Sequence, residues 1–322
     1  MRQIGASGPP KAVASRSLEG KMTSPLWSDM CDWQDLATTC SQDDLAVGQA
    51  MLDLDHGWSG RWSATWKVGK AKRTGTVADL DSVPLTGCVP WRGFTWRQRQ
   101  HHRPGLESML TTGRQHGFES HREDQFVVMA DFAGGAEEVL SQPFQLSFQG
   151  EGRWREHIPD FLTVSNQGRW LVDIRPAGRM DDDDLMKFAA SAEVALALGW
   201  GYAVVTGWRP LTWRNVDLLY SRRRPMKDPL GLKPLLLETV RTATSTLTFG
   251  ELAASYEYPA LARPVIVHLL WHRQLGVDLA APFGDGSVLR PASTRAGERA
   301  GRRNLGAGHR GMPDSGRGGM AG

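Results

Sequence analysis

Three acids and one base stand where metal-assisted cleavage of a phosphodiester bond would need them: Glu123, Asp160, Asp173 and Arg175. Asp173 and Arg175 are two residues apart, so on a β-strand their side chains point to the same face. Carboxylate oxygens are hard ligands that favour Mg²⁺, with Mn²⁺ as an alternative, and such a cation activates water and neutralises charge on a phosphate. Because a buried, unpaired carboxylate is costly, we expect a divalent cation or a cationic partner beside Glu123, Asp160 and Asp173.

Each of these residues also has an ordinary structural interpretation. Glu123 could be a helix carboxylate whose head reaches water, and Asp160 could simply begin a strand after Pro159. Asp173 and Arg175 could form a surface ion pair, which usually contributes little. Taken singly, each ordinary interpretation is favoured, so the hypothesis of a site depends on the combination and its order along the chain.

The elements that must position these residues lie between Gly117 and Pro210. Hydrophobic spacing predicts one helix and three strands, over residues 118–132, 144–148, 158–164 and 170–174. The Asn166-Gln167-Gly168 link makes the last two strands a hairpin, which brings Asp160 beside Asp173.

A second helix and a last strand follow the hairpin. Asp181 to Asp184 place negative charge at the start of a helix that runs to Gly199, and residues 202–206 are β-branched enough for a strand. The predicted fold class is therefore α/β, in the order helix, three strands, helix, strand.

The chain resembles the PD-(D/E)xK nuclease superfamily, and more closely the TnsA-like endonuclease subunits of heteromeric transposases. The similar text begins with the histidine-rich run at Gln98 and ends in the apolar run at Trp271, about two-thirds of the chain. Its segments are residues 98–105, 118–123, 130–132, 142–144, 158–161, 172–177, 199–202 and 263–271.

The resemblance implies a restriction-endonuclease-like core that cuts DNA at a transposon end, together with a recombinase subunit and an ATPase regulator. It makes Glu123, Asp160 and Asp173 the metal ligands and puts Arg175 where the superfamily usually has lysine. Arginine stays protonated, so it can stabilise negative charge or orient water but cannot serve as a general base.

Composition divides the remainder of the chain. We expect an irregular N-terminal region over 22–104, the endonuclease core over 105–225, and a helical or winged-helix region over 226–285 that contacts a partner. Residues 1–21 should be disordered, or precede a true start at Met22, and residues 286–322 should form a disordered basic tail.

Charge is distributed unevenly along the chain. The tail from Gly286 carries a net +5 and the whole chain +3, so residues 1–285 carry −2. DNA contacts must then use local patches rather than overall charge. The residues predicted to contact double-stranded DNA are Arg97, Arg99, His102, Arg103 and Arg179. Such runs are more often solvated faces.

Three further features of the sequence limit the class of protein. No apolar run approaches the length of a membrane span, the opening residues lack a secretory signal, and Cys31, Cys40 and Cys88 show no zinc-ligand spacing, which together indicate a cytoplasmic protein. Two alternatives remain open: a stand-alone restriction or repair nuclease on the same core, and an inactive DNA-binding or scaffold module in which Arg175 pairs with Asp173.

Overall fold

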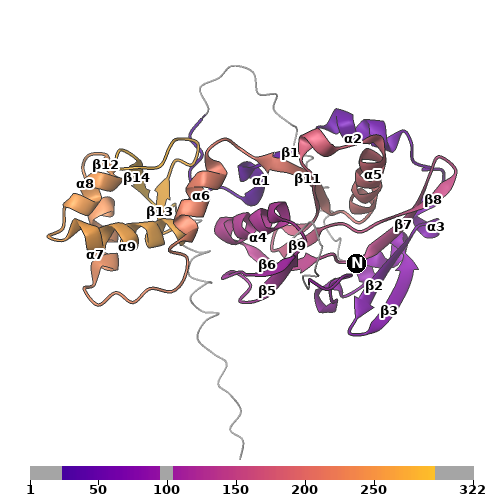
Figure 1. Ribbon diagram of the computed structural model, residues 1–322, viewed down its shortest axis with the longest axis horizontal. Coiled ribbons are helices and arrows are strands. Elements are labelled where there is room, and N and C mark those ends of the chain that lie inside the picture. The colour runs from indigo at the N-terminus through magenta and orange to yellow at the C-terminus, as the bar shows by residue number, and fades with distance from the viewer. Residues whose placement is uncertain (1–23, 95–103, 294–322) are drawn as a thin grey trace, which may run out of the picture.

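A five-stranded sheet forms the centre of the computed structural model, which describes residues 24–94 and 104–293 (Figure 1). β9 (Phe161–Ser165) and β10 (Gly168–Ile174) pair antiparallel across a two-residue turn, so the predicted hairpin is confirmed. Helix α5 (Asp182–Ala197) then crosses to β11 (Gly201–Trp208), which lies parallel to β10. The chain is thus mixed α/β, with the strand order β1-β11-β10-β9-β6.

Alternating side chains explain why helices cover both faces of this sheet. Phe161 and Val172 pack in one core with α4 (His121–Ala133), whereas Leu162 and Leu171 pack in another with α5. This period of two is what a strand buried on both faces requires. Ser120 caps the start of α4, and Gly134 follows its end with a φ of 70°.

The predicted first strand of the central sheet was assigned to the wrong segment. β7 (Gln145–Gly150) is a strand, but it belongs to a second sheet of order β3-β2-β7-β8, with β2 at Ser63–Val68, β3 at Ala71–Thr76 and β8 at Arg153–His157. Its expected place is taken by β6 (Ala136–Ser141). The two adjacent glutamates of β6 break the apolar pattern by which a buried strand is recognised in a sequence. Glu138 is nevertheless buried, and an ion pair with Arg114 neutralises its charge.

The described part of the N-terminal region is more regular than expected. β1 (Ala37–Thr39) completes the central sheet by pairing with β11, and α2 (Gln42–Gln49) packs on α5, so the layered core begins well before the predicted boundary at residue 105. The smaller elements before the hairpin are α1 (Trp33–Leu36), α3 (Trp58–Arg61), η1 (Val77–Ser82), η2 (Leu85–Gly87), β4 (Gly105–Ser108) and β5 (Gln115–Phe118).

The C-terminal region combines three helices with a small sheet of its own. Helices α7 (Leu232–Thr242), α8 (Phe249–Ala254) and α9 (Pro259–Trp271) accompany a three-stranded sheet of order β12-β14-β13, built from Leu247–Thr248, Val288–Pro291 and Leu275–Val277. The predicted disordered tail therefore began too early, because β14 lies within it. Residues 294–322 of that tail, like residues 1–21, fall outside the described residues.

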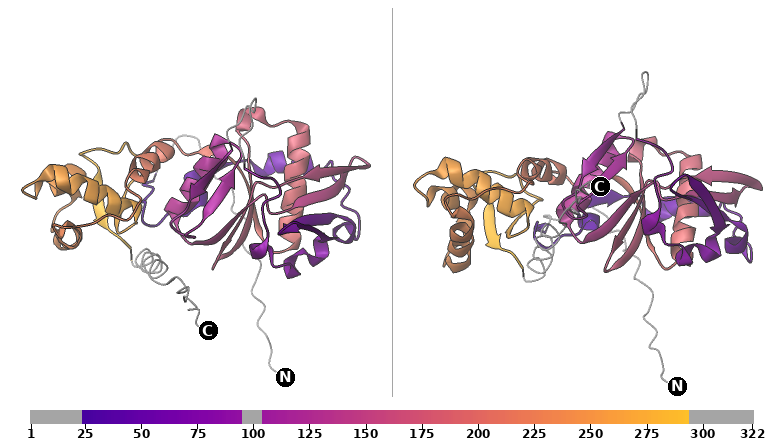
Figure 2. Two further views of the ribbon diagram at one scale, coloured as in Figure 1. Left: turned by 60° about the horizontal axis from the view of Figure 1, so that its bottom comes forward. Right: turned by 90° about the horizontal axis from the view of Figure 1, so that it is seen from below.

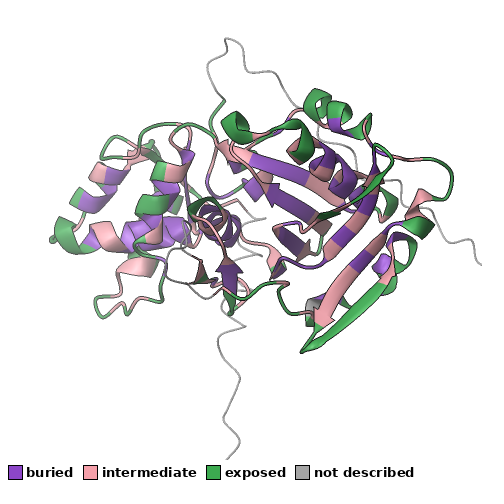
Figure 3. Cartoon of the chain, turned by 45° about the vertical axis from the view of Figure 1, so that its right-hand side comes forward, coloured by how far each residue is buried: buried purple, intermediate pink, exposed green. Residues whose placement is uncertain are grey.

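This region is displaced along the long axis from the central sheet, with α6 (Thr212–Tyr220) between them (Figures 1 and 2). It nevertheless shares one apolar core with the sheet, through the ring contact of Trp271 with Phe132. The N-terminal segment adds a buried ion pair between Asp29 and Arg290 of β14. The region is thus anchored on the core while α7, α8 and the 278–287 connection keep exposed surface (Figure 3).

No helix within the described ranges is long and apolar enough to cross a membrane. Cys31, Cys40 and Cys88 are all free thiols, as expected from their spacing.

The close packing of α2 on α5 provides a test of this fold. A Cβ atom on Gly48 would overlap the backbone carbonyl of Leu185, so Gly48→Ala should destabilise the protein by about 1–3 kcal/mol. Gly60→Ala is the control, because nothing lies within 4 Å of its added Cβ. Urea unfolding of both variants checks this, and an unchanged midpoint for Gly48→Ala would contradict the described packing.

Candidate active site

Asp160 lies directly before β9, at the end of the sheet where β10 finishes. Its Oδ2 accepts a hydrogen bond from the backbone N–H of Ile174, 2.7 Å away. Its own carbonyl accepts from the backbone N–H of Gln142 at 2.7 Å. The strand register, which pairs Phe161 with Val172, puts Asp160 on the same sheet face as Asp173.

Asp173 is the most buried of the predicted acids, with a residue exposure of 1%. One carboxylate oxygen lies 2.9 Å from Nε2 of His157, at the end of β8, and the other accepts from the Tyr202 hydroxyl at 2.8 Å. These two partners, from the second sheet and from β11, fix the orientation of this carboxylate.

Glu123 extends from the first turn of α4. Its two oxygens accept from the backbone N–H of Glu119 and from the Ser120 hydroxyl, both at 2.8 Å. The Ser120 hydroxyl in turn accepts from the backbone N–H of Glu123, which caps the helix. Glu123 therefore combines a capping role with a position next to the other acids.

The electrostatics link Asp160 to each of the other two acids. The pKa of the Asp160 carboxyl lies well above its usual range, because burial disfavours the charged form and because Glu123 and Asp173 repel it. Burial also raises the pKa of Glu123, against the hydrogen bonds it accepts. Burial and the neighbouring Asp173 hold the pKa of the Tyr202 hydroxyl far above its usual value, so it remains a donor.

Arg175 does not pair with Asp173. Its Nη2 lies 2.7 Å from Oδ2 of Asp184, in the first turn of α5, and its Nε donates to the carbonyl of Arg179 at 3.2 Å. The ion pair expected of an inactive site, between Arg175 and Asp173, is therefore replaced by an ion pair with α5. The Arg175 side chain is 40% exposed, which leaves part of the guanidinium open to solvent.

The three acids can be tested for their fit to a divalent cation. In residues 24–94 and 104–293, no group of three acidic, histidine or cysteine side chains is close enough to form a ready-made metal site. The ligand type and charge nevertheless fit Mg²⁺, because Asp160 is repelled by two carboxylates and no described donor reaches its Oδ1. Glu123 already accepts hydrogen bonds on both oxygens, and each oxygen keeps a second lone pair for a cation.

The predicted DNA contacts are largely outside the described residues. Arg97, Arg99, His102 and Arg103 all lie in the segment 95–103. Arg179 is exposed in η3 (Ala177–Arg179), and its carbonyl accepts from Arg175. Its predicted contact with DNA stays a prediction.

Sequence reasoning missed the partners that orient the acids. His157 directly precedes the Ile158-Pro159-Asp160 run, and Tyr202 begins the last strand, but only the folded sheets bring both to Asp173. The 2.9 Å ion pair between Arg92 and Glu119, near Glu123, was also not predicted. The only sequence signal for these partners was that a histidine and a tyrosine lie next to segments predicted to carry the site.

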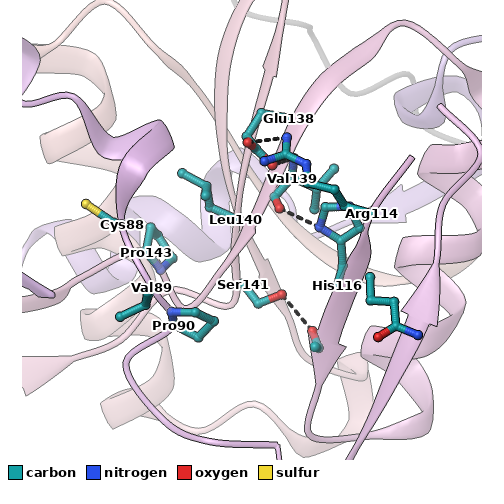
Figure 4. A pocket seen from close by; sticks show the side chains of 12 residues that line it. Cys88, Val89, Pro90, Arg114, His116, Glu138, Val139, Leu140, Ser141 and Pro143 are labelled. Carbon is teal, nitrogen blue, oxygen red and sulfur yellow. Dashed lines mark hydrogen bonds and ion pairs between the residues drawn. The ribbon is translucent and has the colours of Figure 1, made fainter. Parts of the chain in front are cut away.

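The cavity of about 150 Å³ in Figure 4 lies elsewhere. It is bordered by the open edge of β6 and by β5, with His116 bonded to the carbonyl of Val139 and the Ser141 hydroxyl to the carbonyl of Gly117. None of the four predicted site residues lines it, so it is a separate feature of the fold.

No protein-family model matches the chain, and no curated protein sequence matches it either.

The repulsion at Asp160 predicts that its charge costs stability when no metal is present. A raised native pKa means that native stability falls as pH rises from the unfolded pKa towards the native one. Asp160→Asn should therefore stabilise the metal-free protein at neutral pH by about 1 kcal/mol or more, with a smaller gain near pH 4.

Thermal unfolding in chelator at several pH values measures this difference. The matched control is Asp217→Asn, because this exposed carboxylate of α6 forms no ion pair within the described residues and its loss should change little. A destabilised Asp160→Asn at neutral pH would show that the Asp160 charge is well accommodated and would remove this description of the site.

Proposed function

We propose that this chain is a Mg²⁺-dependent DNA endonuclease, the nuclease subunit of a heteromeric transposase that hydrolyses phosphodiester bonds at transposon ends. The observation that carries the proposal is the juxtaposition of Asp160 and Asp173 across the β9–β10 hairpin, with Glu123 near enough to repel the Asp160 carboxylate. Mutually repelling carboxylates cost stability, so a fold that gathers them from separate elements has a use for them.

The order of elements supports the same proposal. Once β7 and β8, which belong to the second sheet, are set aside, the order from α4 to β11 is helix, three strands (β6, β9 and β10), helix, strand. This is the order expected of a restriction-endonuclease-like core, with the acids at the ends of the strands and at the start of the first helix.

The proposed roles follow from chemistry and position. Mg²⁺ held by the three carboxylates would neutralise charge on the phosphate and acidify a water molecule. His157 and Tyr202 orient the Asp173 carboxylate, as outer partners of a metal ligand do. Arg175, always protonated, would hold the scissile phosphate with its planar guanidinium, and Asp184 keeps it at the end of β10.

Partners are proposed from the same resemblance: double-stranded DNA, a recombinase subunit and an ATPase regulator, all in the cytoplasm. The C-terminal region supports a protein partner. Helix α9 is mostly buried, and its Arg263 is committed to Asp285 in two hydrogen bonds of 2.6 and 2.9 Å. Exposed Tyr258 and Leu261 give this part of the surface an apolar character suited to protein contact.

A specific observation favours one second candidate, a catalytically inactive DNA-binding or scaffold module. Protein donors already satisfy Glu123 and Asp173, and Arg175 is engaged by Asp184. Such a module would need no cation, and it predicts no cleavage by the native chain under any divalent metal.

Cleavage of a transposon-end duplex, with Mg²⁺ and the recombinase subunit present, tests the proposal. The native chain should cut, and Asp160→Ala should abolish cutting while the fold persists, because Asp160 is the acid that faces the other two. Asp217→Ala is the control for loss of an exposed carboxylate. A folded Asp160→Ala protein that cuts as well as the native chain would contradict the proposal.

Arg175 gives a second prediction on the same assay. Arg175→Lys should keep measurable cleavage because it keeps the charge, whereas Arg175→Ala should reduce the rate on the order of 100-fold, as for the loss of one charge-stabilising donor. A Mg²⁺ titration of all three proteins measures this. An inactive native chain that gains activity with lysine would instead support the inactive-module candidate.

A further inference from the structure

The β2–β3 hairpin carries a run of positive charge that no carboxylate of the described chain balances. Between Asp55 and Asp79 the sequence contains no acidic residue. Within the described residues, four cations of this hairpin form no ion pair with a carboxylate: Lys67, Lys70, Lys72 and Arg73. β3 is also an edge strand of its sheet, and most of it is exposed (Figure 3).

Two of these lysines lie directly opposite each other on the paired strands. Lys67 and Lys72 are direct cross-strand partners, and like charges in that position are destabilising. Both ammonium groups lie near the ring of Trp91, at 5.1 and 4.6 Å from its centroid, and Lys67 also donates to the Trp91 carbonyl. The aromatic ring offsets part of the repulsion, but a bound anion would offset far more.

The same segment connects the hairpin to the acids. Trp91 donates from its backbone to the carbonyl of Gln142 at 3.1 Å, and Gln142 donates to the carbonyl of Asp160 at 2.7 Å. The next residue, Arg92, donates its backbone N–H to the Gln142 side chain and pairs with Glu119 at the edge of the site. An anion bound at the hairpin would thus lie close to the candidate active site.

We propose that the β2–β3 hairpin, with Trp91, is a binding site for the phosphate backbone of the DNA duplex. This inference rests on the proposed function, which is the reason that the polyanion is taken to be DNA. Four cations over one hairpin, none paired with a described carboxylate, suit a polyanion with regularly spaced phosphates better than a single small anion. Strand β3 and the hairpin turn would neutralise phosphates flanking the bond presented to the acids.

The test uses the full chain, a labelled DNA duplex and fluorescence anisotropy in chelator, so that binding is measured without cleavage. The hairpin variant replaces three exposed cations at once: Lys70→Gln, Lys72→Gln and Arg73→Gln. Lys67 is left intact because it also holds the Trp91 carbonyl. The matched control removes three exposed cations that form no ion pair among the described residues: Arg153→Gln, Arg222→Gln and Arg224→Gln.

The hairpin variant should bind about 10-fold or more weakly near 0.1 M salt, and the slope of log K against log salt should fall by about 2 to 3. The control variant should keep most of the affinity and slope. Equal losses in both variants, unchanged binding by a folded hairpin variant, or no duplex binding by the native chain would overturn the inference. Binding of polyglutamate with the affinity and salt slope of DNA would also overturn it.

The inference and the proposed function can fail separately. Asp217→Ala should bind the duplex like the native chain in this assay, because this exposed carboxylate of α6 lies outside both the hairpin and the candidate active site. Hairpin-dependent binding by a chain that never cleaves would sustain the inference and remove the nuclease proposal. Cleavage by the native chain, together with normal binding and cleavage by the hairpin variants, would support the nuclease proposal and remove the inference about the hairpin.

Discussion

The candidate site depends on one constraint: the Asp160 carboxylate is buried and is repelled by both Glu123 and Asp173. Asp160 and Asp173 share one end of the β9–β10 hairpin, and Glu123 reaches them from the start of α4. Each carboxylate is held by donors from a different place: a backbone N–H, a histidine with a tyrosine, or a helix cap. The second sheet and β11 are therefore part of the site, because they supply His157 and Tyr202.

Local patterns were enough to predict the hairpin, the two helices around it and the meeting of Asp160 with Asp173. They failed where tertiary contacts override local polarity, as in β6, whose buried Glu138 is neutralised by Arg114 from outside the strand. They also failed for His157, because its role depends on a strand of another sheet. The strand β14 was missed because its pairing with β12 and β13 and its packing on α7 depend on tertiary structure and leave no local pattern in its few apolar residues.

Charge is separated across this part of the molecule. Residues 1–285 carry a slight net negative charge. They nevertheless include the β2–β3 hairpin, whose four cations form no ion pair with any described carboxylate. The acids and that hairpin are joined through Gln142, whose φ of 49° turns the chain sharply between β6 and β7. A polyanionic substrate and a divalent cation would each compensate one side of this arrangement, and Arg175, beside α5, would stand near the substrate.

Thermal unfolding in the presence of Mn²⁺ tests most directly whether the acids form a cation site. A ligand that binds only the folded state stabilises it by about 2.7 kcal/mol at 100 times its dissociation constant. The account predicts a Tm that rises with Mn²⁺ for the native chain and a rise that is lost in Asp160→Ala. No rise for the native chain, or the same rise in both proteins, would contradict a cation site at Glu123, Asp160 and Asp173.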